Sequence, residues 1–150
     1  MRVLIQRVSE ASVAINNTLH SSISGGMLVL CGFEEADTVE DIQWICMKIV
    51  NLRIFGDEEG KMNLSLLDVQ GELLIVSQFT LHALTKKGNR PSFINAAKPE
   101  QAIPLYEMFI ERFSVDFNIQ AKTGVFGANM KVALVNDCPV TIWIDSNRKE

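Results

Sequence analysis

The sequence contains few of the features that mark several common protein classes. Its three cysteines, Cys31, Cys46 and Cys138, are widely spaced, so they form neither a disulfide framework nor a Cys-x-x-Cys zinc pair. No apolar run approaches the roughly 18 residues that a membrane span needs. Residues 1–7 alternate as a strand does, unlike a signal peptide. We therefore expect a cytoplasmic protein without a metal or other cofactor, since no His, Cys and carboxylate cluster has ligand spacing.

Excess basic charge is also lacking. The formal net charge is −4, which argues against broad nonspecific binding to nucleic acids, DNA included, because such binding depends on cations that contact phosphates. The local basic cluster is Lys86, Lys87 and Arg90, with Lys98 a little further on. It has two interpretations, a solvated loop or a patch that meets phosphates near one end of an RNA.

The length and pattern predict one domain over residues 1–150, of mixed α+β class. With 47% apolar residues, the chain has enough for one well-formed core. One helix is predicted from Asp37 or Thr38 to about residue 52. A second spans 103–115, with Pro104 in its first turn. Strands are predicted at 2–8, 11–16, 27–33, 72–81, 130–136 and 140–145. Together these elements suggest a curved sheet or small β-barrel with two main helices on one side.

The predicted strand 72–81 turns polar at its far end, where Ser77, Gln78, Phe79 and Thr80 follow an apolar run. Hydroxyl, amide and backbone N–H groups at the end of a buried strand could converge on a ligand. Alternatively, Ser and Thr at strand ends only satisfy nearby backbone groups.

A second segment, residues 136–145 (NDCPVTIWID), gives this pattern more meaning. Together with residues 77–81 (SQFTL) it resembles the two signature motifs of the D-aminoacyl-tRNA deacylases. The likeness continues in residues 6–8, 87–93 and 124–130 and covers nearly the whole chain in the order of the family. One position departs from the pattern, because the family usually has Gly where this chain has Cys138.

The resemblance implies the deacylase fold, a small β-barrel flanked by helices and assembled as a homodimer. It also implies hydrolysis of the ester of D-aminoacyl-tRNA, and of glycine mischarged on alanine tRNA, with the tRNA acceptor end as partner. Backbone N–H groups near Phe79 and Thr80 would form an oxyanion hole, and Ser77 and Gln78 would orient the site. The substrate-binding residues it implies are Arg7, Phe126, Met130, Asn136, Cys138, Pro139, Val140 and Thr141.

The resemblance gives particular roles to the corner around Pro139. In the family this corner is a cis-proline motif that enters the pocket of the partner subunit and excludes L-aminoacyl groups. Arg7 would brace the corner, and Asn136 and Thr141 would satisfy its backbone groups. If the corner requires positive φ, the side chain of Cys138 is strained there, whereas Gly would not be.

Several residues keep alternative interpretations. Thr80 is either a nucleophile or a residue that holds water, and the sequence offers no evident base to activate it. Phe126 either stacks on the terminal adenine or packs in the core. Arg7 is either buried and paired or a surface residue of an edge strand. Cys138 is a structural cysteine or a nucleophile, although neither His20 nor His82 is placed beside it by the sequence.

Two other functions therefore remain open beside the deacylase. One is a tRNA-binding or editing module that has no activity of its own. The other is a small-ester hydrolase that uses Cys138 as its nucleophile. A deacylase with altered stereochemical tolerance is a further variant, because Cys138 replaces the usual Gly.

Overall fold

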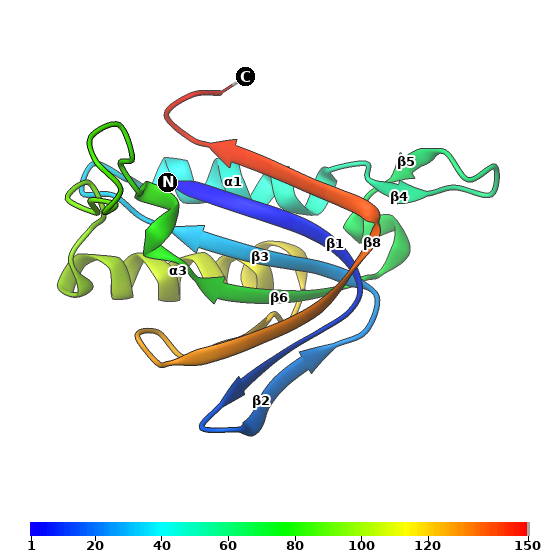
Figure 1. Ribbon diagram of the computed structural model, residues 1–150. Coiled ribbons are helices and arrows are strands. Elements are labelled where there is room, and N and C mark those ends of the chain that lie inside the picture. The colour runs from blue at the N-terminus through cyan, green and yellow to red at the C-terminus, as the bar shows by residue number, and fades with distance from the viewer. Residues whose placement is uncertain (150) are drawn as a thin grey trace.

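The computed structural model describes residues 1–149, and its main feature is a curved six-stranded sheet. The central strand β1 pairs with β3 along its first half, with β2 along its second half and with β8 along its length. β3 then pairs in parallel with β6, and β6 with β7. Figure 1 shows the sheet curling so that the lower parts of β1, β2 and β8 bend away from the rest. The strands are β1 Arg2–Ile15, β2 Thr18–Ile23, β3 Gly26–Gly32, β6 Glu72–Ser77, β7 Lys122–Thr123 and β8 Met130–Asp145.

Two long strands replace four that the sequence predicted as separate. β1 runs without a break through residues 9–10, because it exchanges β3 for β2 as its partner there and the register with β8 shifts at the same place. β8 likewise continues through residues 137–139. β1 and β2 are joined by a turn at Asn16 and Asn17, and both residues have positive φ (52° and 60°), which Asn tolerates well.

The two main helices are present, and one begins earlier than predicted. α1 (Val39–Asn51) starts after Thr38, whose hydroxyl accepts a hydrogen bond from the backbone of Asp41 in a capping box. α3 (Pro99–Phe117) has Pro99 in its first turn, and Pro104 lies inside the helix. The prediction of 103–115 was therefore wrong at its start, because the proline that opens the helix is Pro99.

Short elements that the sequence pattern did not reveal complete the chain. They are β4 Phe55–Gly56, β5 Met62–Leu64, α2 Leu66–Val69 and a single 3₁₀ turn, η1, at Phe79–His82. Strands β2 and β7 of the main sheet were not predicted either. Among the described residues, no helix has both the length and the apolar character needed to cross a membrane.

Hydrophobic residues pack on both faces of the sheet. Leu73 and Ile75 of β6 face the helices and join a core with Phe109 and Phe113 of α3. Leu74 and Val76 point the opposite way, into a smaller cluster inside the curl of β1, β2 and β8. Strand side chains alternate between the two faces of a sheet, so both sets of β6 side chains are buried.

The parallel pairing of β3 with β6 depends on close contact between backbones at Gly26. A Cβ atom built there would lie 1.9 Å from the carbonyl oxygen of Glu72. The adjacent Gly25 has open space around the same position. A side chain is therefore sterically excluded at Gly26 but has room at the neighbouring Gly25.

We expect Gly26→Ala to lower the free energy of unfolding by about 3 kcal/mol, the upper end of the usual cost of overpacking, because backbone atoms must move. Gly25→Ala is the matched control and should be neutral or slightly stabilising, by up to ~1 kcal/mol. Urea unfolding followed by circular dichroism measures both. Equal stability of the two variants would show that β3 and β6 are not packed this closely.

Candidate active site

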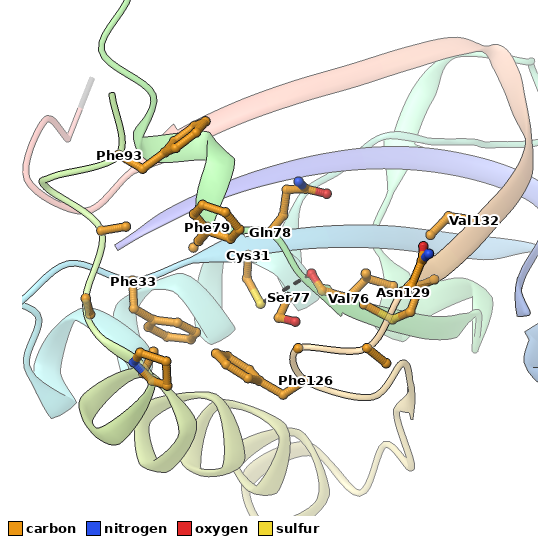
Figure 2. Close-up of a pocket in the computed structure, with 18 residues that line it drawn as sticks. Cys31, Phe33, Val76, Ser77, Gln78, Phe79, Phe93, Phe126, Asn129 and Val132 are labelled. Carbon is orange, nitrogen blue, oxygen red and sulfur yellow. Dashed lines mark hydrogen bonds between the residues drawn. The ribbon is translucent and has the colours of Figure 1, made fainter. Parts of the chain in front are cut away.

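A cavity of about 610 Å³ opens at the end of β6, between η1, α3 and the segment that enters β8. Five residues that the sequence proposed as site residues line it, namely Ser77, Gln78, Phe79, Phe126 and Met130. Figure 2 shows Phe79 and Phe93 at one rim and Phe33 and Phe126 low in the cavity, near α3. Thr80 belongs to the same 3₁₀ turn as Phe79 and hydrogen-bonds to the lining residue Gln78.

The chain leaves the sheet at Ser77, so the predicted strand over 72–81 was wrong in its last four residues. The last pair of the β3–β6 ladder joins Cys31 to Ser77, and the backbone N–H of Gln78 still donates to the Cys31 carbonyl (2.6 Å). Beyond that point β3 ends and offers no further partner, so the chain turns into η1. The alternation of Gln78 and Thr80 with the strand residues is therefore lost.

Gly32 makes room for this turn. A Cβ atom at Gly32 would lie 2.8 Å from the Gln78 carbonyl oxygen and 3.0 Å from the ring of His82. Both distances are shorter than ordinary contacts, so the turn rests directly on the backbone of β3. The position of η1 is thereby determined by a main-chain contact instead of by flexible side chains.

The backbone N–H groups of Phe79 and Thr80 are the first two of the 3₁₀ turn. A helical turn leaves its first donors without partners of its own, and neither group has a hydrogen-bond acceptor within the described residues. The Gln78 side-chain amide donates to the Thr80 hydroxyl. The site therefore presents two free backbone donors and one oriented hydroxyl beside the cavity.

Aromatic rings form the walls. Phe79 is 56% exposed, and its ring makes an edge contact with Phe93 at a centroid distance of 5.1 Å. Phe126 leans on Tyr106 of α3 at 5.6 Å and also touches the core, so it is both a wall residue and a packing residue. Such surfaces suit flat, apolar ligand groups.

The cysteine that lines the cavity, Cys31, is poorly suited to act as a nucleophile. Burial raises the pKa of its thiol far above the usual value, and the thiol donates to the Val76 carbonyl (3.7 Å). A neutral, buried thiol is inert. Within residues 1–149 no group of three His, Cys, Asp or Glu side chains could hold a metal ion.

His82 is fully buried under η1, and neither ring nitrogen has a hydrogen-bond partner in the described part of the chain. It packs against Gly32, so it belongs to the cavity end of the sheet and not to the Cys138 corner.

The corner around Pro139 lies elsewhere in the same protomer. Figure 1 shows the bend of β8 at the end of the sheet away from η1, and none of residues 136–141 lines the cavity. The peptide bond before Pro139 is trans, since no cis bond occurs in the described chain, which differs from the cis-proline motif of the family. Cys138 has φ of +73° and is exposed.

Arg7 holds the base of this corner. Its guanidinium is 7% exposed and donates to the Asp137 carbonyl from two nitrogens, at 3.1 and 3.3 Å. A third nitrogen donates to the Ile54 carbonyl. Of the two interpretations of Arg7, the buried and paired one is therefore correct.

Side-chain hydrogen bonds complete the corner. Asn136 accepts from the backbone N–H of Val140 (3.1 Å) and donates to the hydroxyl of Thr141 (2.9 Å). Gln6 of β1 also donates to Thr141 (3.4 Å). The bend of β8 from 136 to 141 is thus a braced, protruding element, with Cys138 and Pro139 exposed at its tip.

Part of the cavity wall was missed by sequence reasoning. Phe33, Phe93 and Asn129 line it, together with Pro99 and Ala102 of α3. Phe33 and Ala102 carry no polar signal, and only the fold brings them to β6. Phe93 lies within the stretch 87–93 that supported the resemblance, which is the one signal that could have indicated it.

The strain at Cys138 leads to a stability prediction. A residue with Cβ in the left-handed region costs about 1–2 kcal/mol, while Gly costs about 0.5–1 kcal/mol in entropy. Cys138→Gly should therefore raise the free energy of unfolding by about 0.5–1 kcal/mol in urea titrations. Cys138→Ala keeps the Cβ atom and should leave it unchanged. Equal values for the Gly and Ala variants would contradict a left-handed residue at the corner.

Comparisons with known proteins agree over nearly the whole length. The family model described as D-Tyr-tRNA(Tyr) deacylase matches residues 4–145. D-aminoacyl-tRNA deacylases of Bacteroides fragilis and Flavobacterium psychrophilum are 61% and 56% identical to this chain, and each alignment covers 100% of both chains.

Solved structures give the same picture of the fold. One described as the c-Myc DNA Unwinding Element Binding Protein has a TM-score of 0.92 at 41% identity, covering 97% of this chain and 98% of that chain. A probable eukaryotic D-amino acid tRNA deacylase has a TM-score of 0.81 at 17% identity, covering 95% and 97%, and shares the fold. The match of the family model over residues 4–145 and the identity of 56–61% with full-length relatives show that this chain belongs to the D-Tyr-tRNA(Tyr) deacylase family.

Proposed function

We propose that this protein hydrolyses the ester bond of D-aminoacyl-tRNA and releases the free D-amino acid and tRNA. The observation that carries the proposal is the pair of backbone N–H groups at Phe79 and Thr80, which have no acceptor in the described chain and stand beside the cavity. Two such donors suit the oxyanion that forms when water attacks an ester carbonyl. Membership of the family supports the same reaction.

The chemistry follows from what the site offers. The ester carbonyl oxygen accepts hydrogen bonds from the two free N–H groups, each worth roughly 2.7–4 kcal/mol when preorganised. Thr80, oriented by Gln78, positions the attacking water or the amino group of the substrate. The 2′-hydroxyl of the terminal adenosine helps to activate the water. Phe126 provides an aromatic face on which the terminal adenine stacks.

Selection of the D-isomer requires a second element, and we assign it to the corner at Cys138 and Pro139 of a partner subunit in a homodimer. In its own protomer the corner is exposed and away from the cavity. Backbone atoms held by Arg7 form a rigid wall, and a wall of main-chain atoms rejects a side chain on the L face whatever its chemistry. Glycyl groups, which have no side chain, pass the same filter.

The work of such an enzyme lies in the cytoplasm, where aminoacyl-tRNA is made and used. All three cysteines are free, which fits a reducing compartment.

The direct test is single-turnover hydrolysis of D-tyrosyl-tRNA and L-tyrosyl-tRNA by the purified protein. We expect rapid release of D-tyrosine only. Gly32→Ala should slow this release by about 10²–10³-fold, the usual effect of losing one oxyanion donor, because the added Cβ displaces the turn that carries Phe79 and Thr80.

Gly25→Ala, where a Cβ meets nothing within 4 Å, is the matched control, and thermal melting establishes that the Gly32 variant is folded. Release of both isomers would defeat the proposed filter. Release of neither isomer would defeat the proposed reaction.

A second candidate function is nucleic-acid binding without hydrolysis, favoured by the 41% identical structure described as binding a DNA unwinding element. It predicts that tRNA or DNA binds to the wild-type protein while neither aminoacyl ester is cleaved. The unpartnered donors at the turn favour the hydrolase.

A third candidate is an esterase that uses the Cys138 thiol as its nucleophile. Chemical modification of that thiol distinguishes it from the proposed deacylase. Cys138 is exposed, while Cys31 and Cys46 are buried and burial raises the pKa of both thiols, to about 12 for Cys46. Iodoacetamide should therefore alkylate Cys138 alone. Because alkylation also adds bulk to the corner, the decisive variant is Cys138→Ala, which removes the thiol and keeps the main-chain wall, and we expect it to change D-tyrosyl-tRNA hydrolysis less than about threefold. Complete loss of activity, with Cys138→Ala equally inactive, would identify the thiol as the nucleophile.

A further inference from the structure

A basic hairpin stands next to the cavity. We use this name for residues 84–92, whose base is closed by two hydrogen bonds between Leu84 and Ser92, at 2.8 and 3.0 Å. Every residue of its tip, 85–91, is exposed. Figure 1 shows this loop rising directly from η1. Of the two interpretations of the basic cluster, a solvated loop or a patch that meets RNA phosphates, the structure supports the second.

The charge of the chain is strongly divided. Residues 73–99 contain Lys86, Lys87, Arg90 and Lys98 and no acidic residue, whereas the rest contains ten basic and eighteen acidic residues, a formal charge of −8. The side chain of none of these four residues has an ion pair or hydrogen bond with another described residue. By contrast Arg2 and Arg112, elsewhere in the protein, have carboxylate partners.

The hairpin is held in a defined position relative to the cavity. Immediately after it, Phe93 makes its edge contact with Phe79 of η1, as Figure 2 shows at the upper rim. A few residues further on, the backbone N–H of Ala97 donates to the Phe33 carbonyl (2.8 Å). Phe33, Phe79, Phe93 and Ala97 all line the cavity. The cations are therefore fixed to the same wall that receives the ligand.

The composition of the tip indicates what it contacts. Residues 85–91 are Thr, Lys, Lys, Gly, Asn, Arg and Pro, with no aromatic or large aliphatic side chain. Protein interfaces are enriched in aromatic residues and depleted in Lys, so a protein partner is a poor match. Unpaired cations on long, flexible side chains suit phosphates, which they contact without reading the base sequence.

We propose that the basic hairpin binds backbone phosphates of the RNA strand whose 3′ end enters the cavity. This inference rests on the proposed function, because it takes the aminoacylated end of tRNA as the occupant of the cavity. Lys86, Lys87 and Arg90 supply the contacts, and the acidic remainder of the protein repels the rest of the RNA. The hairpin thus contributes to substrate affinity without taking part in the ester chemistry.

The test compares two triple variants with the same formal charge. The first, Lys86→Gln, Lys87→Gln and Arg90→Gln, neutralises the hairpin. The matched control, Lys48→Gln, Lys61→Gln and Arg112→Gln, neutralises three cations on other elements. Each is measured with D-tyrosyl-tRNA, with D-tyrosyl-adenosine, which carries the same ester and no phosphate, and with uncharged tRNA in binding titrations from 50 to 300 mM salt.

We expect the hairpin variant to lose at least tenfold in kcat/KM for D-tyrosyl-tRNA and to bind uncharged tRNA correspondingly more weakly. The slope of log affinity against log salt should fall by about 2, since each phosphate contact contributes about 0.7–0.9. Hydrolysis of D-tyrosyl-adenosine should be unchanged, and the control variant should resemble the wild type throughout.

Two results would overturn the proposal. An unchanged salt slope would mean that the hairpin touches no phosphate. An equal loss with D-tyrosyl-adenosine would mean that it acts through the geometry of the site. Failure of the proposed function is distinguishable, because the wild type would then cleave neither ester while binding to uncharged tRNA still reports on the hairpin.

Discussion

The site depends on the point at which the β3–β6 ladder ends. The pair Cys31–Ser77 is the last in register, and beyond it the chain of β6 has donors and acceptors but no neighbouring strand. Backbone polar groups in such a place must find other partners or face a ligand. Here the chain turns across Gly32, where any side chain would collide with it, and two N–H groups are left free at the cavity. Because the parallel pairing of β3 with β6 ends at Ser77, the backbone N–H groups of Phe79 and Thr80 remain available to bind a ligand.

A second buried group organises the other end of the sheet. Arg7 interrupts the apolar face of β1, at the place where the register with β8 shifts. Its guanidinium hydrogen-bonds to the backbone carbonyls of Asp137 and Ile54 and pairs with the Asp137 carboxylate. A buried cation of this kind is costly unless it is fully paired. Its partners lie on the segment before Cys138 and on Ile54 after α1, so one side chain ties the corner to the helical layer. The corner can protrude and still be rigid.

The sequence predicted those parts of the molecule that are governed by local patterns. The cap of α1 at Thr38 and the apolar run of β6 are each determined by nearby residues, and each was predicted. Two of the errors, in β1 and at 72–81, have a common cause, because they occur where tertiary contacts override the local pattern. β1 continues through residues 9–10 since β8 and β2 supply partners there, and the strand at 72–81 stops early since β3 ends.

The candidate site divides in the same way. Ser77, Gln78, Phe79, Phe126 and Met130 meet at one cavity, as the motifs suggested, while Phe33 and Ala102 reach it only through the packing of β3 and α3. The positive φ of Cys138 is a feature that the sequence motif could not predict. The replacement of Gly was visible in the sequence, but whether the backbone required Gly could be decided only from the dihedral angle.

The separation of charge in this chain also affects how it meets another molecule. Four cations without ion pairs stand close to the cavity, whereas the remainder of the chain has a formal charge of −8, so the local charge at the hairpin has the opposite sign to the net charge of the protein. A polyanion approaching from the wrong side is repelled, and one near the basic end is drawn in, so collisions are oriented before contact. At physiological salt this acts only within the Debye length of about 8 Å. Productive encounters are thus selected during the last few ångströms of diffusion, and the association rate, more than the lifetime of the complex, responds to ionic strength.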